Sequence, residues 1–433
     1  MRATVCALLC AMAHAGEAEK PGLVAIAPLE WLPLLAPWVD ARKRDLEVEA
    51  VALEDVLATN EGRDAPERIK RYLWRGWREK GLRYALLVGD ADTFPFRFMV
   101  LDRCTEQAFD TAFYPSDLYY GDVAREDGSF DDWNGKTDAH HASYIGEVQG
   151  EKVKEPPINL DGISYVPEVA VGRWPVSNAT DLAAVVAKTL AWDPAKRERK
   201  ALLVHQDGWV DAAARVGSWG DSLEAAGWSV ERQIHPATAP TPASVLAALR
   251  KGVVLALHSG HGEAWGWHNC LGPAEEKALA DAPPAIIASA GCGTAVVTVQ
   301  PPYEAYLDVH GVLHKGTNSG ELFSSPPAPP SPLQPGRLER SSIAERLLRE
   351  PRGGAVAYIG CTTGAQPCAL TLIEGLALSR EKRLGDAWNA ALARYWREER
   401  LAELTPTADW YPPSIFFQGM KFILLGDPSL PLP

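Results

Sequence analysis

The sequence predicts an α/β protein built on mostly parallel, doubly wound sheet structure. Runs that are apolar throughout suit strands covered on both faces, as at residues 22–28, 84–90, 200–208 and 252–260. Segments with helical spacing and plausible caps lie between such runs, at residues 64–80, 179–192, 242–251 and 341–351. Strands that alternate with helices in this way form layered sheets.

The chain is long enough for two or three domains. With 433 residues, 46% of them hydrophobic, it can bury substantial cores. We expect two layered units that divide near residue 180, an N-terminal subdomain over 16–180 and a C-terminal catalytic subdomain over 181–433. Residues 1–15 have a basic start, a short apolar run and a small-x-small site ending at Ala15, which predicts a cleaved signal peptide.

Charge and cysteine content narrow the functional classes. The net charge of −13, without a dense Lys/Arg run, argues against nucleic acid as the partner. No later segment approaches the roughly 20 apolar residues of a membrane-spanning helix, so we expect a secreted, periplasmic or extracellular protein. After signal removal an odd number of cysteines remains, which leaves a thiol unpaired; their pairing stays open. These cysteines are Cys104, Cys270, Cys292, Cys361 and Cys368.

Two predicted strands end in glycine-rich turns that carry reactive side chains. "VVLAL" leads into "HSGHG", and "PAIIAS" leads into "AGCG", so His261 and Cys292 both lie at strand ends, where ligands collect in open α/β sheets. A cysteine nucleophile needs an imidazole to take its proton and to protonate the leaving amine. The N–H groups of Gly262 and Cys292 are the candidate oxyanion donors. The alternative is a buried structural cysteine beside a hydrogen-bonded loop histidine.

The same stretch allows other interpretations. Imidazole and thiolate ligands within a dozen residues suit zinc, but their spacing is poor, and we expect His258 to pack beneath the loop. The candidate zinc ligands are His258, His261, His268 and Cys270. Trp265 and Trp267 are candidate walls for a peptide substrate, with capping of the core edge as the alternative.

An acidic, glycine-containing stretch at residues 117–138 is a candidate calcium site. Its hard oxygen ligands suit calcium, although their spacing misses the EF-hand pattern and a solvated turn is the alternative. The candidate ligands are Asp117, Asp122, Asp127, Asp131, Asp132, Asn134 and Asp138. No cofactor is expected for catalysis.

Several segments together resemble the gingipain-type cysteine peptidases of the caspase-like clan. "SGHGEAWGW" and "PAIIASAGCGTA" resemble the histidine and cysteine elements of that family. The likeness continues, in the family's order, through "YALLVGDADTFP", "PSDLYYGDV", "VPEVAVGRWPV", "GGAVAYIGCTTGA" and "KFILLGDPSL". It covers the catalytic unit, without a counterpart of the immunoglobulin-like domain found in the best-known members.

The resemblance implies a caspase-like fold and hydrolysis of protein or peptide substrates through an acyl-enzyme on a Cys–His dyad. It implies that Glu168, before a strand, can orient His261 as a third member, with an exposed glutamate at a strand start as the alternative. Asp181 resembles an acid that recognises basic side chains in arginine-specific members, although an acid at a helix start also suits the helix dipole. The resemblance also implies a structural calcium ion, which is common in the family. The competing class is a catalytically inactive scaffold that kept the fold.

Overall fold

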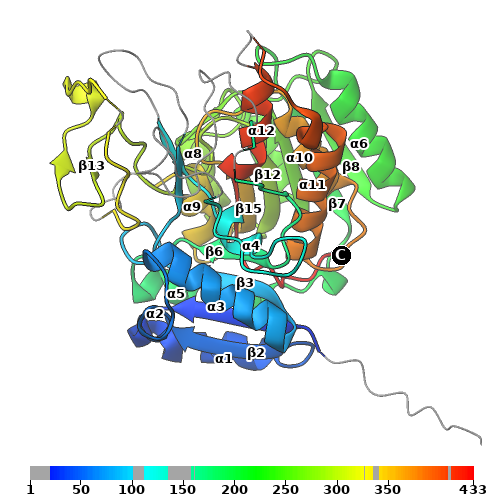
Figure 1. Cartoon of the computed structure of the whole chain (residues 1–433). Coiled ribbons are helices and arrows are strands. Elements are labelled where there is room, and N and C mark those ends of the chain that lie inside the picture. Colours follow the sequence, from blue (N-terminus) through cyan, green and yellow to red (C-terminus); the bar gives the residue numbers. More distant parts are fainter. Residues whose placement is uncertain are drawn as a thin grey trace, which may run out of the picture.

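The computed structural model describes residues 20–100, 112–134, 158–159, 161–325, 327–334, 341–407 and 411–433. A ten-stranded sheet runs through the molecule, with helices on both faces (Figure 1). In spatial order its strands are β2 (Glu47–Ala52), β1 (Gly22–Ala27), β3 (Leu82–Val88), β6 (Ala170–Trp174), β16 (Phe422–Leu425), β15 (Ala355–Cys361), β12 (Ala285–Ser289), β9 (Leu255–Ser259), β7 (Lys200–His205) and β8 (Ser229–Ile234).

The sheet consists of two parallel halves that run in opposite directions. Neighbours are parallel except β15 and β16, which pair antiparallel with Gly360 opposite Ile423. One continuous sheet therefore includes strands from both sides of residue 180. β6 is the last strand before residue 180, but β16, from the end of the chain, runs parallel to β6 and completes the N-terminal half. The carboxyl ends of β12, β9 and β7 consequently lie at the same edge as the amino end of β6.

The helices form two layers that bury the two faces of the sheet in separate cores. One face packs against α2 (Leu53–Thr59), α3 (Ala65–Lys80), α4 (Leu118–Gly121), α6 (Ala213–Ala225), α10 (Ala369–Ala377), α11 (Leu384–Glu398) and α12 (Tyr411–Lys421). The other packs against α1 (Leu32–Arg42), α5 (Ala179–Ala191), α7 (Pro242–Arg250) and α9 (Ile343–Arg349), with α8 (Pro273–Ala278) beside α7 and α9. The fold class expected from the sequence, mostly parallel and doubly wound, is confirmed.

Local signals set the ends of the predicted helices. Asp64 caps α3 by accepting from Glu67 N–H, and Gly81 ends α3 with a φ of 63°, a conformation that glycine adopts without strain. Ser342 and Glu345 form a capping box at the start of α9. The cap of α5 is Asn178, rather than the neighbouring serine or threonine.

Short strand pairs and 3-10 turns lie outside the ten-stranded sheet. They are β4 (Phe98–Val100) with β5 (Phe113–Pro115), β10 (Gly262–Glu263) with β11 (Gly266–Trp267), and β13 (Tyr306–Leu307) with β14 (Leu313–His314). Single 3-10 turns lie at Leu29–Trp31, Pro194–Lys196, Leu279–Asp281, Thr317–Ser319 and Leu401–Glu403. The described helices include none with the length and apolar character needed to cross a membrane.

Candidate active site

The register of two neighbouring strands brings His261 and Cys292 to the same level. β9 and β12 are parallel, with His258 opposite Ser289. His261 and Cys292 each follow three positions later, so the two loops leave the sheet together, one strand spacing apart, about 4.8 Å. We call residues 260–264 the His261 loop and residues 290–294 the Cys292 loop.

The two loops touch through glycine backbone. A Cβ atom added to Gly291 would lie 2.9 Å from Gly262 Cα and 3.2 Å from Gly260 O, and one added to Gly262 would lie 3.2 Å from Cys292 O. Real Cβ atoms do not approach other atoms at 2.9 Å. Glycine at these positions is therefore what allows the loops to meet.

A backbone carbonyl holds the His261 ring. Nε2 of His261 lies 2.8 Å from Gly208 O, in the turn that follows β7. A carbonyl oxygen only accepts, so Nε2 carries the proton and Nδ1 keeps its lone pair. In this tautomer Nδ1 is the nitrogen able to take a proton from a thiol.

Cys292 differs from the other described cysteines in its exposure. Its Sγ accepts from Ala365 N–H at 3.2 Å, beyond the end of β15, and the side chain is only partly buried. Cys270, Cys361 and Cys368 are fully buried and unbridged, and burial raises the pKa of each thiol to about 12. Among the cysteines the structure describes, Cys292 is thus the accessible thiol; Cys104 lies outside the described residues.

The hairpin geometry directs one predicted oxyanion donor toward the Cys292 loop. His268 N donates to His261 O at 3.1 Å, which makes these residues a hydrogen-bonded pair. Such pairs alternate along an antiparallel ladder, so Gly262, which faces Trp267, belongs to a pair that is not hydrogen-bonded. Its N–H therefore points away from β11, toward Gly291.

Trp267 is a core residue, so for this tryptophan the core-edge alternative holds and the substrate-wall role does not. It is fully buried and stacks on His258, with ring centroids 4.3 Å apart. His258 lies beneath the loop, as expected. Trp265 points outward at 45% exposure and stacks on His268, so it stays available to a substrate.

The zinc interpretation does not fit this arrangement. His258 and Cys270 are buried, His258 bonds to Ser289, and His261 bonds to Gly208. No described group of three or more His, Cys, Asp or Glu side chains converges as metal ligands would.

Glu168 and His261 are not brought together. The Glu168 carboxylate accepts from Val123 N–H at 2.9 Å and Ala124 N–H at 3.2 Å, whereas His261 is held by Gly208. β6 and β9 are four strand spacings apart, roughly 19 Å. Burial, and then the nearby Asp122, raises the pKa of Glu168 to about 7. Glu168 thus holds the loop that follows α4, at Val123 and Ala124.

Asp181 lies at the opposite edge of the sheet from Cys292. It stands in the first turn of α5, where its N–H is capped by Asn178 and its carboxylate accepts from the Asn178 side-chain amide at 2.9 Å. α5 follows the carboxyl end of β6, and the two halves of the sheet run in opposite directions. The capping geometry and helix dipole account for Asp181 in this structure.

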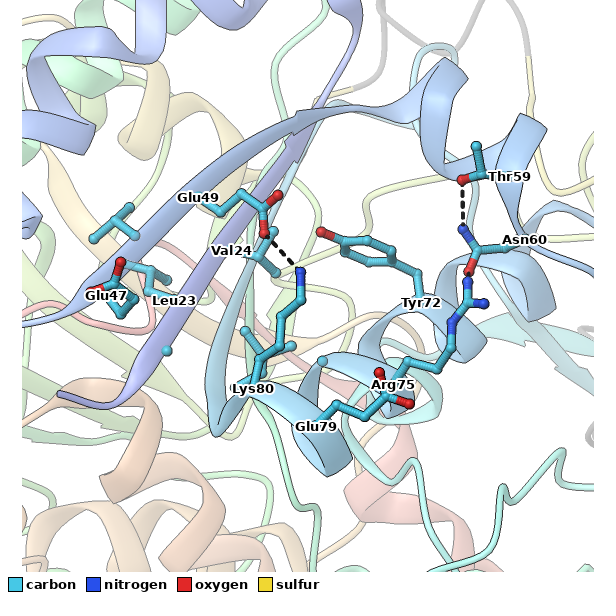
Figure 2. A pocket seen from close by; sticks show the side chains of 14 residues that line it. Leu23, Val24, Glu47, Glu49, Thr59, Asn60, Tyr72, Arg75, Glu79 and Lys80 are labelled. Atoms are coloured by element: carbon cyan, nitrogen blue, oxygen red, sulfur yellow. Dashed lines mark hydrogen bonds and ion pairs between the residues drawn. The ribbon is translucent and has the colours of Figure 1, made fainter. Parts of the chain in front are cut away.

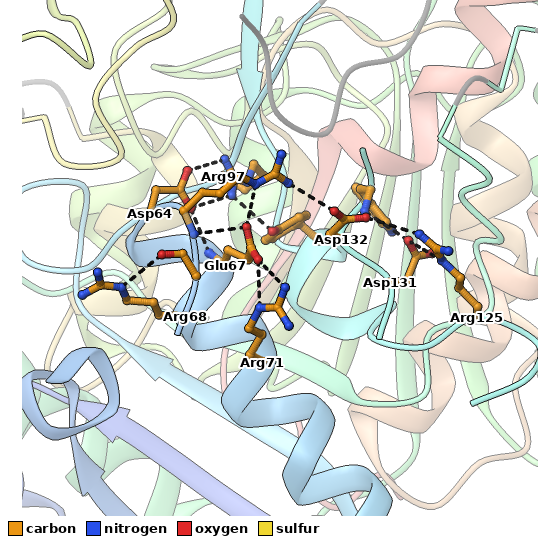
Figure 3. Close-up of polar contacts among 12 residues, drawn as sticks. Asp64, Glu67, Arg68, Arg71, Arg97, Arg125, Asp131 and Asp132 are labelled. Atoms are coloured by element: carbon orange, nitrogen blue, oxygen red, sulfur yellow. Dashed lines mark hydrogen bonds and ion pairs between the residues drawn. The ribbon is translucent and has the colours of Figure 1, made fainter. Parts of the chain in front are cut away.

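Several aspartates of the acidic stretch form ion pairs with arginines. Asp117 pairs with buried Arg173 at 2.8 Å, and Figure 3 shows Asp131 and Asp132 turned toward Arg125. Asp122 accepts from Trp133 Nε1, while Asp127 is exposed and accepts from Ser129 N–H. Asn134 ends this described part of the stretch, and Asp138 lies outside the described residues.

A buried lysine occupies the interior of this cluster. Lys70 Nζ lies 4.3 Å from the ring centroid of Tyr119 and 4.6 Å from that of Trp133. Burial lowers its pKa to about 8, an effect that Asp122 and Asp131 oppose. Asp122 and Asp131 thus act on a buried protein ammonium group, and the described carboxylates do not converge as calcium ligands would.

A cavity of about 700 Å³ lies elsewhere, between α3, the edge strand β2 and its neighbour β1 (Figure 2). Its charges are mixed: Lys80 pairs with Glu49 at 3.8 Å, and Arg75 donates to Asn60. No dyad residue lines it. We therefore assign it no part in the site.

A partly exposed cysteine and a hydrogen-bonded histidine on touching loops, at the carboxyl edge of this sheet, fit a cysteine peptidase. The model of peptidase family C25 matches residues 17–433, and the chain belongs to this family. It is a gingipain-type cysteine peptidase catalytic unit, and thus a hydrolase.

Solved structures share the fold. The Arg-specific cysteine proteinase gingipain R matches with a TM-score of 0.62 and 16% identity, over 96% of this chain and 79% of that chain. The complex of the Porphyromonas gingivalis RgpB pro- and mature domains matches at 0.62 and 15% identity, over 94% of this chain and 79% of that chain. A search of curated protein sequences found no match.

Sequence reasoning missed several residues that build the site. Gly208 and Ala365 contribute backbone groups from loops far away in the sequence, so no side-chain pattern points to them. Ser289 and Tyr358 lie inside apolar strand runs. A hydroxyl within such a run was the available signal, because a buried hydroxyl needs a partner.

Proposed function

We propose that the chain hydrolyses peptide bonds inside protein substrates, with Cys292 as nucleophile and His261 as general base and then acid. The register of His258 opposite Ser289 carries this proposal, because it sets the two loops side by side. The partial exposure of Cys292 supports it, since a substrate carbonyl must reach the sulfur.

The chemistry follows from the atoms at the site. His261 Nδ1 takes the Cys292 proton, and the thiolate attacks the substrate carbonyl carbon to give a tetrahedral intermediate. The N–H groups of Gly262 and Cys292 are the proposed donors to its oxyanion. The protonated imidazole gives its proton to the leaving amine as the C–N bond breaks. A water molecule, deprotonated by the imidazole, then releases the acyl group and restores the thiol.

Gly208 O takes the orienting role that Glu168 was expected to play. A hydrogen bond from Nε2–H fixes the tautomer and the ring direction, which is the task of the third member of a triad. A neutral carbonyl is sufficient where the dyad shares a single proton.

Specificity and export complete the proposal. A preference for a basic residue before the scissile bond cannot rest on Asp181, so cleavage of a peptide library must decide it. Export rests on residues 1–15, which lie outside the described residues. The metal-free chemistry above needs no cofactor.

Replacing either member of the dyad tests the assignment. We expect Cys292→Ala and His261→Ala to lose nearly all turnover of the peptide library, and the double variant to be hardly worse, because each group is useless without the other. His268→Ala is the matched control, since its ring lies 5.7 Å from that of His261 and takes no part in the chemistry. Folded wild-type protein without turnover would favour the scaffold alternative.

A further inference from the structure

Buried, hydrogen-bonded side chains lie directly beneath the catalytic loops, and the reaction above does not use them. Trp267 Nε1 donates to the Tyr358 hydroxyl at 2.9 Å. Burial raises the pKa of that hydroxyl, and hydrogen bonding with its neighbours Thr294 and Ser289 opposes the rise. Ser289, Thr294 and Tyr358 are buried with essentially no exposure. Tyr358 thus joins the hairpin after β9 to β15, the strand that pairs with β12.

The direction of these bonds can be assigned. An indole N–H only donates, so the Tyr358 oxygen accepts from Trp267 and its own proton is available to Ser289 or Thr294. Ser289 Oγ lies 2.8 Å from His258 Nδ1. Burial lowers the pKa of His258 to about 3, so the ring is neutral and Nδ1 can accept the Ser289 proton.

Two buried hydroxyls near Tyr358, those of Ser289 and Thr294, act on one residue, Gly291, which immediately precedes the nucleophile. Ser289 Oγ accepts from Gly291 N–H at 3.1 Å. Thr294 Oγ1 donates to Gly291 O at 3.3 Å. The N–H and the C=O of Gly291 are therefore held from opposite ends of the Cys292 loop. Gly291 is also the residue that meets Gly262 of the His261 loop.

We propose that Tyr358, Ser289 and Thr294 form a positioning clamp that fixes the backbone of Gly291 and thereby sets the Cys292 sulfur relative to His261. The clamp rests on the proposed dyad and deepens it. Its three members touch neither substrate nor reacting atoms, so they are positioning residues. Neutral hydroxyls suit the task, because they satisfy buried backbone groups without adding charge beneath the sulfur.

Tyr358→Phe tests the clamp, because it keeps the ring and removes only the shared hydroxyl. With a fluorogenic peptide that the wild type cleaves, we expect kcat to fall about tenfold or more while KM stays unchanged, since a small misplacement of the nucleophile is costly. Alkylation of Cys292 by iodoacetamide, followed by mass spectrometry, should slow by a similar factor.

Thr294 provides a matched pair of variants. Thr294→Ser keeps the hydroxyl and loses the methyl group, whereas Thr294→Val keeps the shape and loses the hydroxyl. We expect the Ser variant to retain most of the wild-type kcat and the Val variant to resemble Tyr358→Phe. If Tyr358→Phe unfolds, the comparison of Thr294→Ser with Thr294→Val still tests the clamp.

A buried serine at the opposite edge of the sheet is the control for stability. Ser429 Oγ donates to Asp427 Oδ1 at 2.6 Å, so Ser429→Ala removes a buried hydroxyl far from Cys292 and should leave kcat unchanged. Wild-type kcat and alkylation in Tyr358→Phe and Thr294→Val, while His261→Ala slows both, would overturn the clamp and leave the dyad standing. Equal alkylation of wild type and His261→Ala would instead overturn the dyad.

Discussion

The Cys292–His261 site and the acidic stretch both stand out in the sequence as clusters of reactive side chains, yet the fold treats them in opposite ways. At the dyad, neighbouring strands present the two side chains on glycine loops, and the sulfur stays partly exposed. In the acidic stretch, Asp122 and Asp131 oppose the burial cost of Lys70, and Asp117, Asp131 and Asp132 pair with arginines. A cluster serves chemistry when the fold leaves its reactive atoms accessible, and serves stability when the fold neutralises them.

The largest effect on this comparison should come from Lys70→Met. Removing the ammonium takes away the charge that opposes the burial cost of the Asp122 carboxylate, so the free energy of unfolding should fall by about 1–3 kcal/mol. Urea denaturation at neutral pH measures this loss. Lys80→Met is the control, because the exposed Lys80–Glu49 pair should contribute less than about 1 kcal/mol. Similar losses in both variants would show that Lys70 is not the centre of the cluster.

The acidic stretch should not need a bound metal ion for stability. Because Lys70 already provides the positive charge, a chelator should leave the Tm of the wild type unchanged. A Tm that drops in chelator and returns with added calcium would show that the acidic stretch does bind the ion.

Gly291→Ala should harm catalysis more than stability. Its Cβ would lie 2.9 Å from Gly262 Cα, which separates the two loops, and a displacement of about 1 Å can cost roughly a hundredfold in rate. Peptide turnover and the Tm measure the two effects. Gly217→Ala is the control, since a Cβ there meets nothing within 4 Å and a helix interior prefers alanine. Wild-type turnover in Gly291→Ala would refute the close approach of the loops.

Glu168→Gln should have the smallest effect, seen in the pH dependence of stability. Glu168 has a folded pKa of about 7, above its ordinary 4.5, so its protonated form stabilises the fold fully below pH 4.5 and this contribution is lost as the pH rises to 7. After allowance for partial exposure, the change is about 1–2 kcal/mol. Unfolding free energies across this window should flatten in Glu168→Gln. An unchanged slope would contradict the assignment.

Local patterns predicted the strands, the helices and the position of His261 and Cys292 after neighbouring strands, because each depends on short runs. Apolar runs that end in glycine, with His261 and Cys292 three positions beyond paired residues, fix the convergence of the loops. Glu168 and Asp181 could not be placed in this way. The edge of the sheet at which each of them lies, relative to Cys292, depends on the antiparallel pairing of β15 with β16. That pairing is a contact between segments far apart in the sequence.

The remaining differences also have distant causes. The charge that closes the acidic stretch comes from Lys70 on α3, which precedes that stretch in the sequence. Alternation in a two-residue hairpin did not reveal that Trp267, and not Trp265, turns inward onto His258. The carbonyl that orients His261 belongs to Gly208, which has no side chain for a motif to record.

Alkylation of Cys292 tests the central claim most directly, because it needs no known substrate. Native wild-type protein and His261→Ala are treated with iodoacetamide at neutral pH, and the modification of each cysteine is followed by mass spectrometry. The account predicts rapid labelling of Cys292 in the wild type, much slower labelling in His261→Ala, and almost none at buried Cys270, Cys361 and Cys368 in either protein. Equal, slow labelling of Cys292 in both proteins would contradict it.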